Sequence, residues 1–88
     1  MVNSFVAGLD VEAAVIAPQI IDYMKRNSMA ADTRRGVIRW WLTSGEKVDP
    51  EAVGRALDHL VKQGFLESRR LPSGDYLYSA ATKQKAGH

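Results

Sequence analysis

Four arginines stand where their side chains can meet phosphate groups. Arg69 and Arg70 directly precede the turn-forming segment 71–74, and Arg34 and Arg35 lie near the expected start of a helix. A guanidinium group carries a permanent charge and donates hydrogen bonds in a planar fork that matches phosphate oxygens. We therefore expect Arg69 and Arg70 to contact nucleic acid, and Arg34 and Arg35, whose charges oppose the helix dipole, to meet phosphate or an acidic group of a protein. The alternative is a solvated surface, on which charged residues also protect an edge strand from unwanted pairing.

A second set of polar side chains forms the outward ridge of the helix expected over 50–63. Its members are Glu51, Arg55, Asp58, His59 and Lys62. If this ridge binds DNA, its contacting residues would be Arg55, His59 and Lys62. Arg55 would pair with guanine, or Arg55 and Lys62 would hold phosphates. The competing interpretation is that each of the two cations pairs with the acid four residues earlier, which is the favourable order on a solvated helix. The sequence leaves both open.

No pattern in the chain indicates catalysis. The sequence contains no cysteine and lacks both a nucleophile–base motif and a glycine-rich phosphate loop. Neither His59 nor His88 has a second ligand at metal-binding spacing. We therefore expect no enzymatic activity, no metal and no cofactor.

Length and charge set wider limits. The 88 residues carry 12 Lys and Arg against 10 Asp and Glu, a net charge of +2, so the position of the cations matters more than their number. A chain of this length predicts one domain, here 10–80, with an N-terminal arm over 1–9 and a flexible tail over 81–88. No apolar run approaches the roughly 18 residues of a membrane span, and no signal peptide is evident. We expect a cytoplasmic protein.

Two helices should precede the ridge helix. Asp10 can cap a first helix, but Pro18 lies in its path. Proline is tolerated in a first helical turn and costly later, so we expect a new start near Ala17 or a kink there, and a main helix over about 18–27. Asp32 or Thr33 can cap a second helix over about 33–43.

The helix over 50–63 has the clearest boundaries. Asp49 can accept a backbone hydrogen bond as its N-cap, Pro50 suits its first turn, and Gly64 suits a left-handed stop. Gly54 is unusual, because glycine inside a helix costs about 1 kcal/mol relative to alanine. Its place beside the apolar side predicts the close approach of another helix, with a tryptophan as the candidate contact.

After Gly64 the apolar period changes to two. Segments 65–70 and 75–79 fit a β-hairpin, and Leu71-Pro72-Ser73-Gly74 supplies its turn. The predicted fold class is therefore α+β, with a three-helix bundle followed by a two-stranded hairpin wing. Because a lone hairpin is marginal in water, one of its faces should pack on the helices.

The order of these elements resembles the winged helix-turn-helix. The stretch VDPEAVGRALDHLVKQGFLESRRLPSGDYLYS, residues 48–79, is similar to the recognition helix and wing of bacterial MarR-type regulators. That resemblance implies a small transcriptional regulator that binds double-stranded DNA. The stretch GVIRWWLTSGEKV, through Gly36, Trp41 and Leu42, resembles the DEP domain, a winged-helix fold associated with protein and membrane partners. The alternative function is therefore a protein-interaction module.

Apolar residues outside the expected core bear on these two functions. Tryptophan buries a large area, so we expect Trp40 and Trp41 in the core, although an exposed Trp40 would mark an interface. The apolar run from Leu9 to Ile21 exceeds the need of a three-helix core. Its residues Val11, Val15 and Ile16 are candidates for a protein interface, including that of a homodimer. Alternatively, the run simply covers the open side of the domain.

Overall fold

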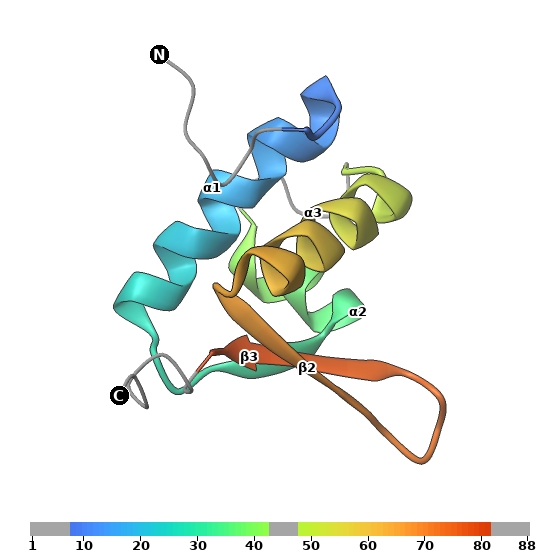
Figure 1. The fold of residues 1–88 in the computed structure, drawn as a ribbon. Coiled ribbons are helices and arrows are strands. Elements are labelled where there is room, and N and C mark those ends of the chain that lie inside the picture. The colour runs from blue at the N-terminus through green and yellow to red at the C-terminus, as the bar shows by residue number, and fades with distance from the viewer. Residues whose placement is uncertain (1–7, 43–47, 82–88) are drawn as a thin grey trace.

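The computed structural model describes residues 8–42 and 48–81. Within them the chain forms three helical segments and three strands (Figure 1). In chain order the elements are α1 (Val11–Arg26), β1 (Ala31–Thr33), α2 (Arg34–Gly36), which continues into the π-helical turn η2 (Val37–Trp41), α3 (Pro50–Gln63), β2 (Leu66–Arg70) and β3 (Tyr76–Ala80). The class is α+β, as the sequence predicts.

The sheet is antiparallel and has three strands in the order β1-β3-β2. The prediction of a two-stranded hairpin was therefore incomplete. Strand β1 pairs Ala31 with Ser79 and Thr33 with Leu77, so β3 is the central strand. Three residues are too few to show the alternation of a strand in the sequence. The sequence instead predicts two of them, Asp32 and Thr33, as possible caps of the second helix. The third strand gives the hairpin the additional pairing that a lone hairpin lacks.

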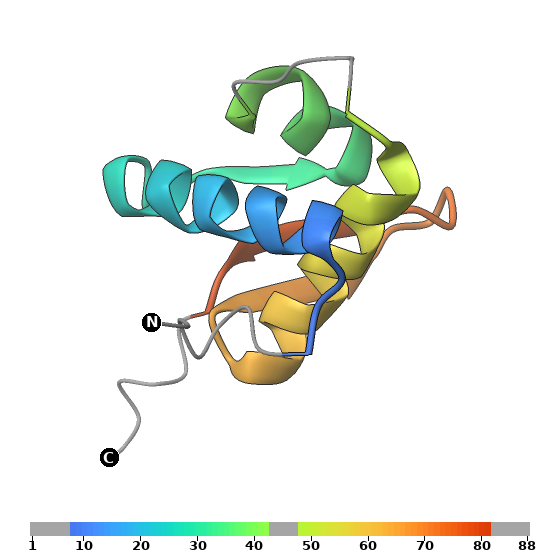
Figure 2. The same ribbon diagram turned by 90° about the horizontal axis from the view of Figure 1, so that it is seen from above.

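Helices α1 and α3 pack against each other and lie over the same face of the sheet (Figures 1 and 2). Helix α1 is a single helix that begins directly after Asp10, so the expected new start near Ala17 was wrong. The Asp10 carboxylate accepts a hydrogen bond from the Ala13 amide at 3.3 Å. Pro18 lies inside this helix, where it removes one backbone donor, and the packed apolar face of α1 holds the helix together.

The second helix begins at Thr33, whose hydroxyl accepts from the Gly36 amide at 3.4 Å. Asp32 does not cap it. Its carboxylate instead accepts a hydrogen bond from Trp41 Nε1 at 2.8 Å, and the Trp41 ring stacks on Tyr23 at a centroid distance of 4.9 Å. Trp41 therefore joins the second helix to α1 and to β1. The helix ends at Trp41, because Leu42 is extended, which is earlier than the predicted end at about 43.

The predicted boundaries of α3 are confirmed. The Asp49 carboxylate accepts from the Glu51 amide at 3.1 Å, and Gly64 closes the helix with a φ of 89°. Strands β2 and β3 begin and end within one residue of their expected positions. Ala81, the first residue of the predicted tail, is buried and its amide donates to Phe65 O at 3.2 Å. The rest of that tail, and the arm over 1–7, lie outside the described residues.

The core lies between α1, the second helix, α3 and the sheet. Its buried residues include small ones on the facing helices, Ala13 and Ala17 on α1 and Ala52 and Ala56 on α3. Ile16 is only 2% exposed, so its assignment to a protein interface was wrong. Trp41 is buried as expected, whereas Trp40 is 66% exposed and does not belong to the core. No helix in the described ranges is long and apolar enough to cross a membrane.

Candidate nucleic-acid interface

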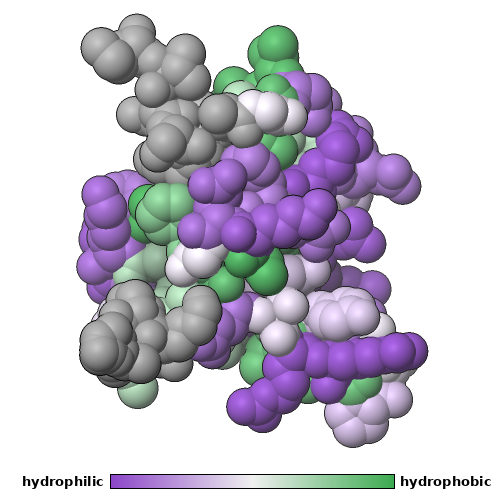
Figure 3. Space-filling view, in the orientation of Figure 1, coloured by the Kyte–Doolittle hydropathy of each residue, from purple (hydrophilic) through white to green (hydrophobic). Residues whose placement is uncertain are grey.

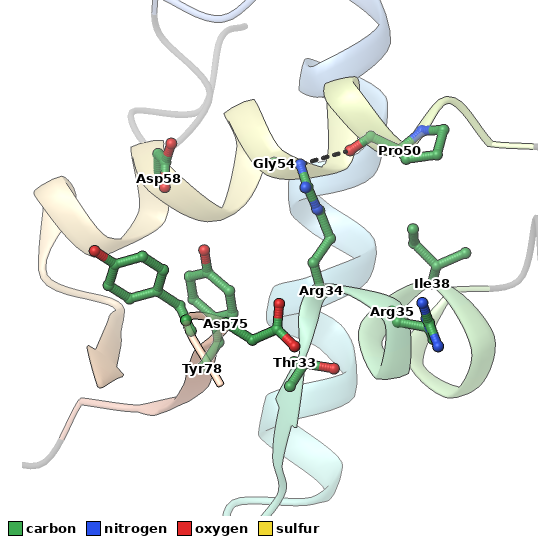
Figure 4. Close-up of a pocket in the computed structure, with 11 residues that line it drawn as sticks. Thr33, Arg34, Arg35, Ile38, Pro50, Gly54, Asp58, Asp75 and Tyr78 are labelled. Carbon is green, nitrogen blue, oxygen red and sulfur yellow. Dashed lines mark hydrogen bonds between the residues drawn. The ribbon is translucent and has the colours of Figure 1, made fainter. Parts of the chain in front are cut away.

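A groove of about 690 Å³ opens between the second helix, α3 and β3 (Figure 4). Its lining residues come from these elements and from the loop before β3. They are Thr33, Arg34, Arg35, Ile38, Pro50, Gly54, Asp58, Gly74, Asp75, Tyr76 and Tyr78. Two guanidinium groups, two carboxylates and two phenol rings thus face one open space, which can hold a polar group of a partner molecule.

Arg34 occupies the middle of this groove and lies over Gly54 of α3 (Figure 4). Its Nη1 donates to Pro50 O at 3.5 Å. A Cβ atom at Gly54 would lie 2.6 Å from Nη1 of Arg34, so the glycine makes room for the arginine. The sequence correctly marked Gly54 as a place of close approach, but the expected tryptophan was the wrong partner.

Tyr78 forms part of the groove floor. Its pKa is raised above the usual value, first because the side chain is buried and next because the Asp58 carboxylate is near. The Arg34 charge acts in the opposite direction and is outweighed. The phenol therefore remains protonated at neutral pH.

The two hairpin arginines lie on opposite faces of the sheet. Arg70 pairs with Tyr76 and Arg69 with Leu77 across the β2–β3 ladder. Directly paired residues point to the same face, so Arg70 shares the face of the groove-lining Tyr76, whereas Arg69 shares the face of Leu77. Both side chains are exposed. Adjacent residues of a strand point to opposite faces, and the register shows that Arg70 is the one on the groove side.

The outward ridge of α3 differs from both expectations for Arg55. Arg55 pairs with Asp10 of α1, with Nε 2.9 Å from Oδ1 and Nη2 3.3 Å from Oδ2. The hydrogen bond from Arg55 lowers the pKa of Asp10, and the same bond raises the pKa of Arg55. Within the described residues, neither Glu51–Arg55 nor Asp58–Lys62 forms an ion pair. Arg55 is thus engaged in holding α3 against the start of α1.

His59 also differs from its predicted place on the exposed ridge. It is only partly exposed, and its Nε2 is buried without a hydrogen-bond partner. No group of three or more potential metal ligands occurs among the residues that the structure describes.

The remaining candidate cations are available to a partner. In the described part of the chain, no ion pair involves Arg34, Arg35, Lys62, Arg69 or Arg70, and all five are exposed. Hydrophilic side chains cover much of the hairpin in the view of Figure 3. Of these cations, Arg34 and Arg35 line the groove and Arg70 shares the face of the groove-lining Tyr76, so these three can contact one partner molecule, whereas Arg69 lies on the other face of the sheet.

Exposed apolar side chains gather on other elements. Val11 is 83% exposed and Val15 is 59% exposed, and the two lie one turn apart on α1. Trp40 projects from η2 with the Arg39 guanidinium 5.6 Å from its ring centroid. Of the residues predicted for a protein interface, Val11, Val15 and Trp40 are thus exposed and Ile16 is buried.

The fold and the site define a small α+β protein with a polar groove between two helices and a hairpin, lined by two arginines and two aspartates. Comparisons with family models, curated proteins and solved structures found no match to this chain. The arguments for its function therefore rest on the geometry above.

Proposed function

We propose that this protein has a winged-helix fold and binds double-stranded DNA, acting as a small transcriptional regulator. The element order supports the fold, because β1 stands between the first two helices and a hairpin follows the third. One observation carries the DNA proposal. Arg34 and Arg35 of the second helix line the groove beside α3, and Arg70 of the hairpin shares the face of the groove-lining Tyr76, all three without any ion pair to a described residue. Cations placed in this way fit the two backbones that border a DNA groove.

In this proposal α3 enters the major groove and the flanking arginines hold phosphates. The exposed ridge of α3 carries Glu51 and Asp58, which repel phosphate but can accept a hydrogen bond from the amino group of cytosine. Lys62 is the cation of this ridge that has no ion-pair partner among the described residues. Arg55 reaches DNA only if it leaves Asp10. Positioning thus comes from the second helix and the hairpin more than from α3 itself.

The test is binding of a fluorescent mixed-sequence duplex, followed by anisotropy at several salt concentrations. If the four arginines neutralise about four phosphates, the slope of log K against log salt is about −3.6, and affinity falls roughly 100-fold from about 50 to 200 mM. Replacing all four arginines with glutamine should abolish this dependence. Lys25→Gln, on the last turn of α1, is the control for each arginine replaced singly, because it also removes one positive charge. Absence of duplex binding by the wild type at the lowest salt would overturn the proposal.

A second candidate function, a DEP-like protein-interaction module, is favoured by the exposed apolar residues. Val11, Val15 and Trp40 present apolar surface that the monomer does not bury. The partner is another protein or a second copy of the chain. Sedimentation over a range of concentrations tests the second copy, and Val15→Asp should then shift the equilibrium to monomer. A monomeric wild type that binds duplex DNA would favour the first function.

A further inference from the structure

Gly54 has no evident role in α3 apart from Arg34. Glycine is unfavourable inside a helix, so a structural reason is needed for its presence at the second turn. The three heavy atoms nearest to a Cβ built there all belong to Arg34, namely Nη1 at 2.6 Å and Cδ and Cζ at 3.7 Å. Gly54 therefore leaves the space that the Arg34 side chain occupies against α3. We call this position the Arg34 seat.

The seated guanidinium keeps most of its binding capacity. Of its five N–H donors, one is directed to Pro50 O, at 3.5 Å. Asp58 and Asp75 line the same groove, yet neither comes within ion-pair distance of Arg34. Figure 4 shows the side chain crossing the groove toward α3, with Arg35 on the Ile38 side. Packing on Gly54 and the hydrogen bond to Pro50 O thus hold Arg34 in position. Its positive charge has no ion-pair partner among the described residues and can attract a bound anion.

We propose that this groove is a phosphate-binding site. Arg34, held in place by Gly54 and Pro50, is the principal residue that contacts the phosphate, and Arg35 supplies a second cation. The inference rests on the proposed DNA-binding function, so the phosphate is one of the duplex backbone. A seated arginine loses less conformational freedom on binding than a free one, so the seat raises affinity without adding a contact. Gly54 is then a positioning residue for DNA binding, although it touches no DNA itself.

If Gly54 makes room for Arg34, Gly54→Ala should change DNA binding without destabilising the helix. The added methyl group displaces Nη1, which is the far end of a flexible side chain, so the fold should persist. Alanine is the better helix former, and the melting temperature should stay the same or rise. Duplex affinity should nevertheless fall several-fold, because Arg34 loses its seat.

Arg34→Gln supplies the second variant. It should weaken duplex binding about tenfold, as expected for the loss of one charge-assisted contact. It should also reduce the magnitude of the salt slope by about 1. In the double variant, Gly54→Ala should add no further loss, because the arginine that needs the glycine is gone. Lys25→Gln, the charge-matched control on α1, should leave the affinity less affected than Arg34→Gln.

The outcomes distinguish this inference from the function on which it rests. If the wild type binds duplex DNA while Gly54→Ala and Arg34→Gln bind equally well, the seat is wrong and the DNA-binding function stands. If Gly54→Ala weakens binding further in the Arg34→Gln background, the glycine acts by another route and the inference is overturned. If the wild type does not bind a duplex at low salt, both proposals fail.

Discussion

Asp10 serves two elements at once. Its carboxylate caps α1 through the Ala13 amide and pairs with Arg55 of α3. The bond from Arg55 lowers the pKa of Asp10, and a lowered pKa means that the folded state binds this proton less readily than the unfolded chain does. The stabilisation is therefore complete above the unfolded pKa, near 3.8, and is lost as the pH falls below it. Arg55 remains charged over the whole range, because its pKa is raised from a value that is already high.

Asp10→Asn tests this pair. Asparagine caps helices about as well as aspartate, so the substitution removes mainly the charge. We expect a lower melting temperature at neutral pH and a difference from wild type that shrinks as the pH falls below 3.8 and through the lowered pKa of Asp10. Thermal unfolding followed by circular dichroism over a pH series measures both. Asp22→Asn, which breaks the exposed Asp22–Arg26 pair, is the control and should change the melting temperature less. An Asp10→Asn deficit that persists unchanged in acid would contradict the prediction.

Gly36 is required by a different contact. A Cβ atom there would lie 2.6 Å from Asp32 Cγ and 2.9 Å from Asp32 Cβ, which cannot move away as a flexible side-chain end can. The Asp32 carboxylate is also the acceptor for Trp41 Nε1. The glycine thus protects a hydrogen bond that fixes the second helix.

Gly36→Ala should therefore destabilise the fold by about 1–3 kcal/mol, although alanine is the better helix former. Urea denaturation gives the free energy of unfolding directly. The double variant Asp32→Ala/Gly36→Ala should lose less than the sum of the two single losses, because alanine at 32 removes the contact with the carboxyl group and leaves only the one with Cβ. Additive losses would show that the methyl group acts through something other than Asp32.

The elements differ in how much the sequence determines them. Helix α3 is predictable to its ends because Asp49, Pro50 and Gly64 each satisfy a local backbone requirement. The start of α1 cannot be predicted in the same way, because Pro18 is unfavourable inside a helix and only the packing of α1 in the fold compensates for it. Strand β1 is missed since its pairing partner is β3, more than 40 residues away in the chain.

The candidate site divides in the same way. That arginines carry the charge is visible in the sequence, because charge belongs to the residue. Arg34 on Gly54 and Arg55 on Asp10 are not visible, because each contact joins separate elements. Only the first contact has a signal in the sequence, which is the glycine inside a helix. That glycine indicates a close approach but does not identify Arg34 as the residue that approaches. Register, which separates Arg69 from Arg70, also requires the folded hairpin.

That separation gives a prediction at the level of the hairpin. Arg70 shares the face of Tyr76 and the groove, whereas Arg69 lies on the opposite face. If DNA follows the groove, Arg70→Gln should weaken duplex binding about tenfold and Arg69→Gln by clearly less. Neither variant should change the melting temperature, because both side chains are exposed. Fluorescence anisotropy with one duplex compares the two. An equal or larger effect of Arg69 would place the DNA on the other face of the hairpin.

At the level of the whole molecule, the margin of stability is narrow. A chain of this size is stable by roughly 4–13 kcal/mol, at about 0.05–0.15 kcal/mol per residue. Its core depends on a few large side chains that are fully buried, among them Leu57 and Leu60 of α3 and Ile20 of α1. The exposed valines of α1 contribute little to that core, so the two groups should respond very differently to truncation.

Leu57→Ala should cost about 2–5 kcal/mol and lower the melting temperature by roughly 10 °C or more. The paired change Val11→Ser/Val15→Ser should cost at most about 0.5 kcal/mol per site, and its effect should not depend on protein concentration. Unfolding at two widely separated concentrations tests both statements. A wild-type melting temperature that rises with concentration, together with a valine variant that does not follow it, would mean that a second copy covers these residues. The valines would then belong to a dimer interface.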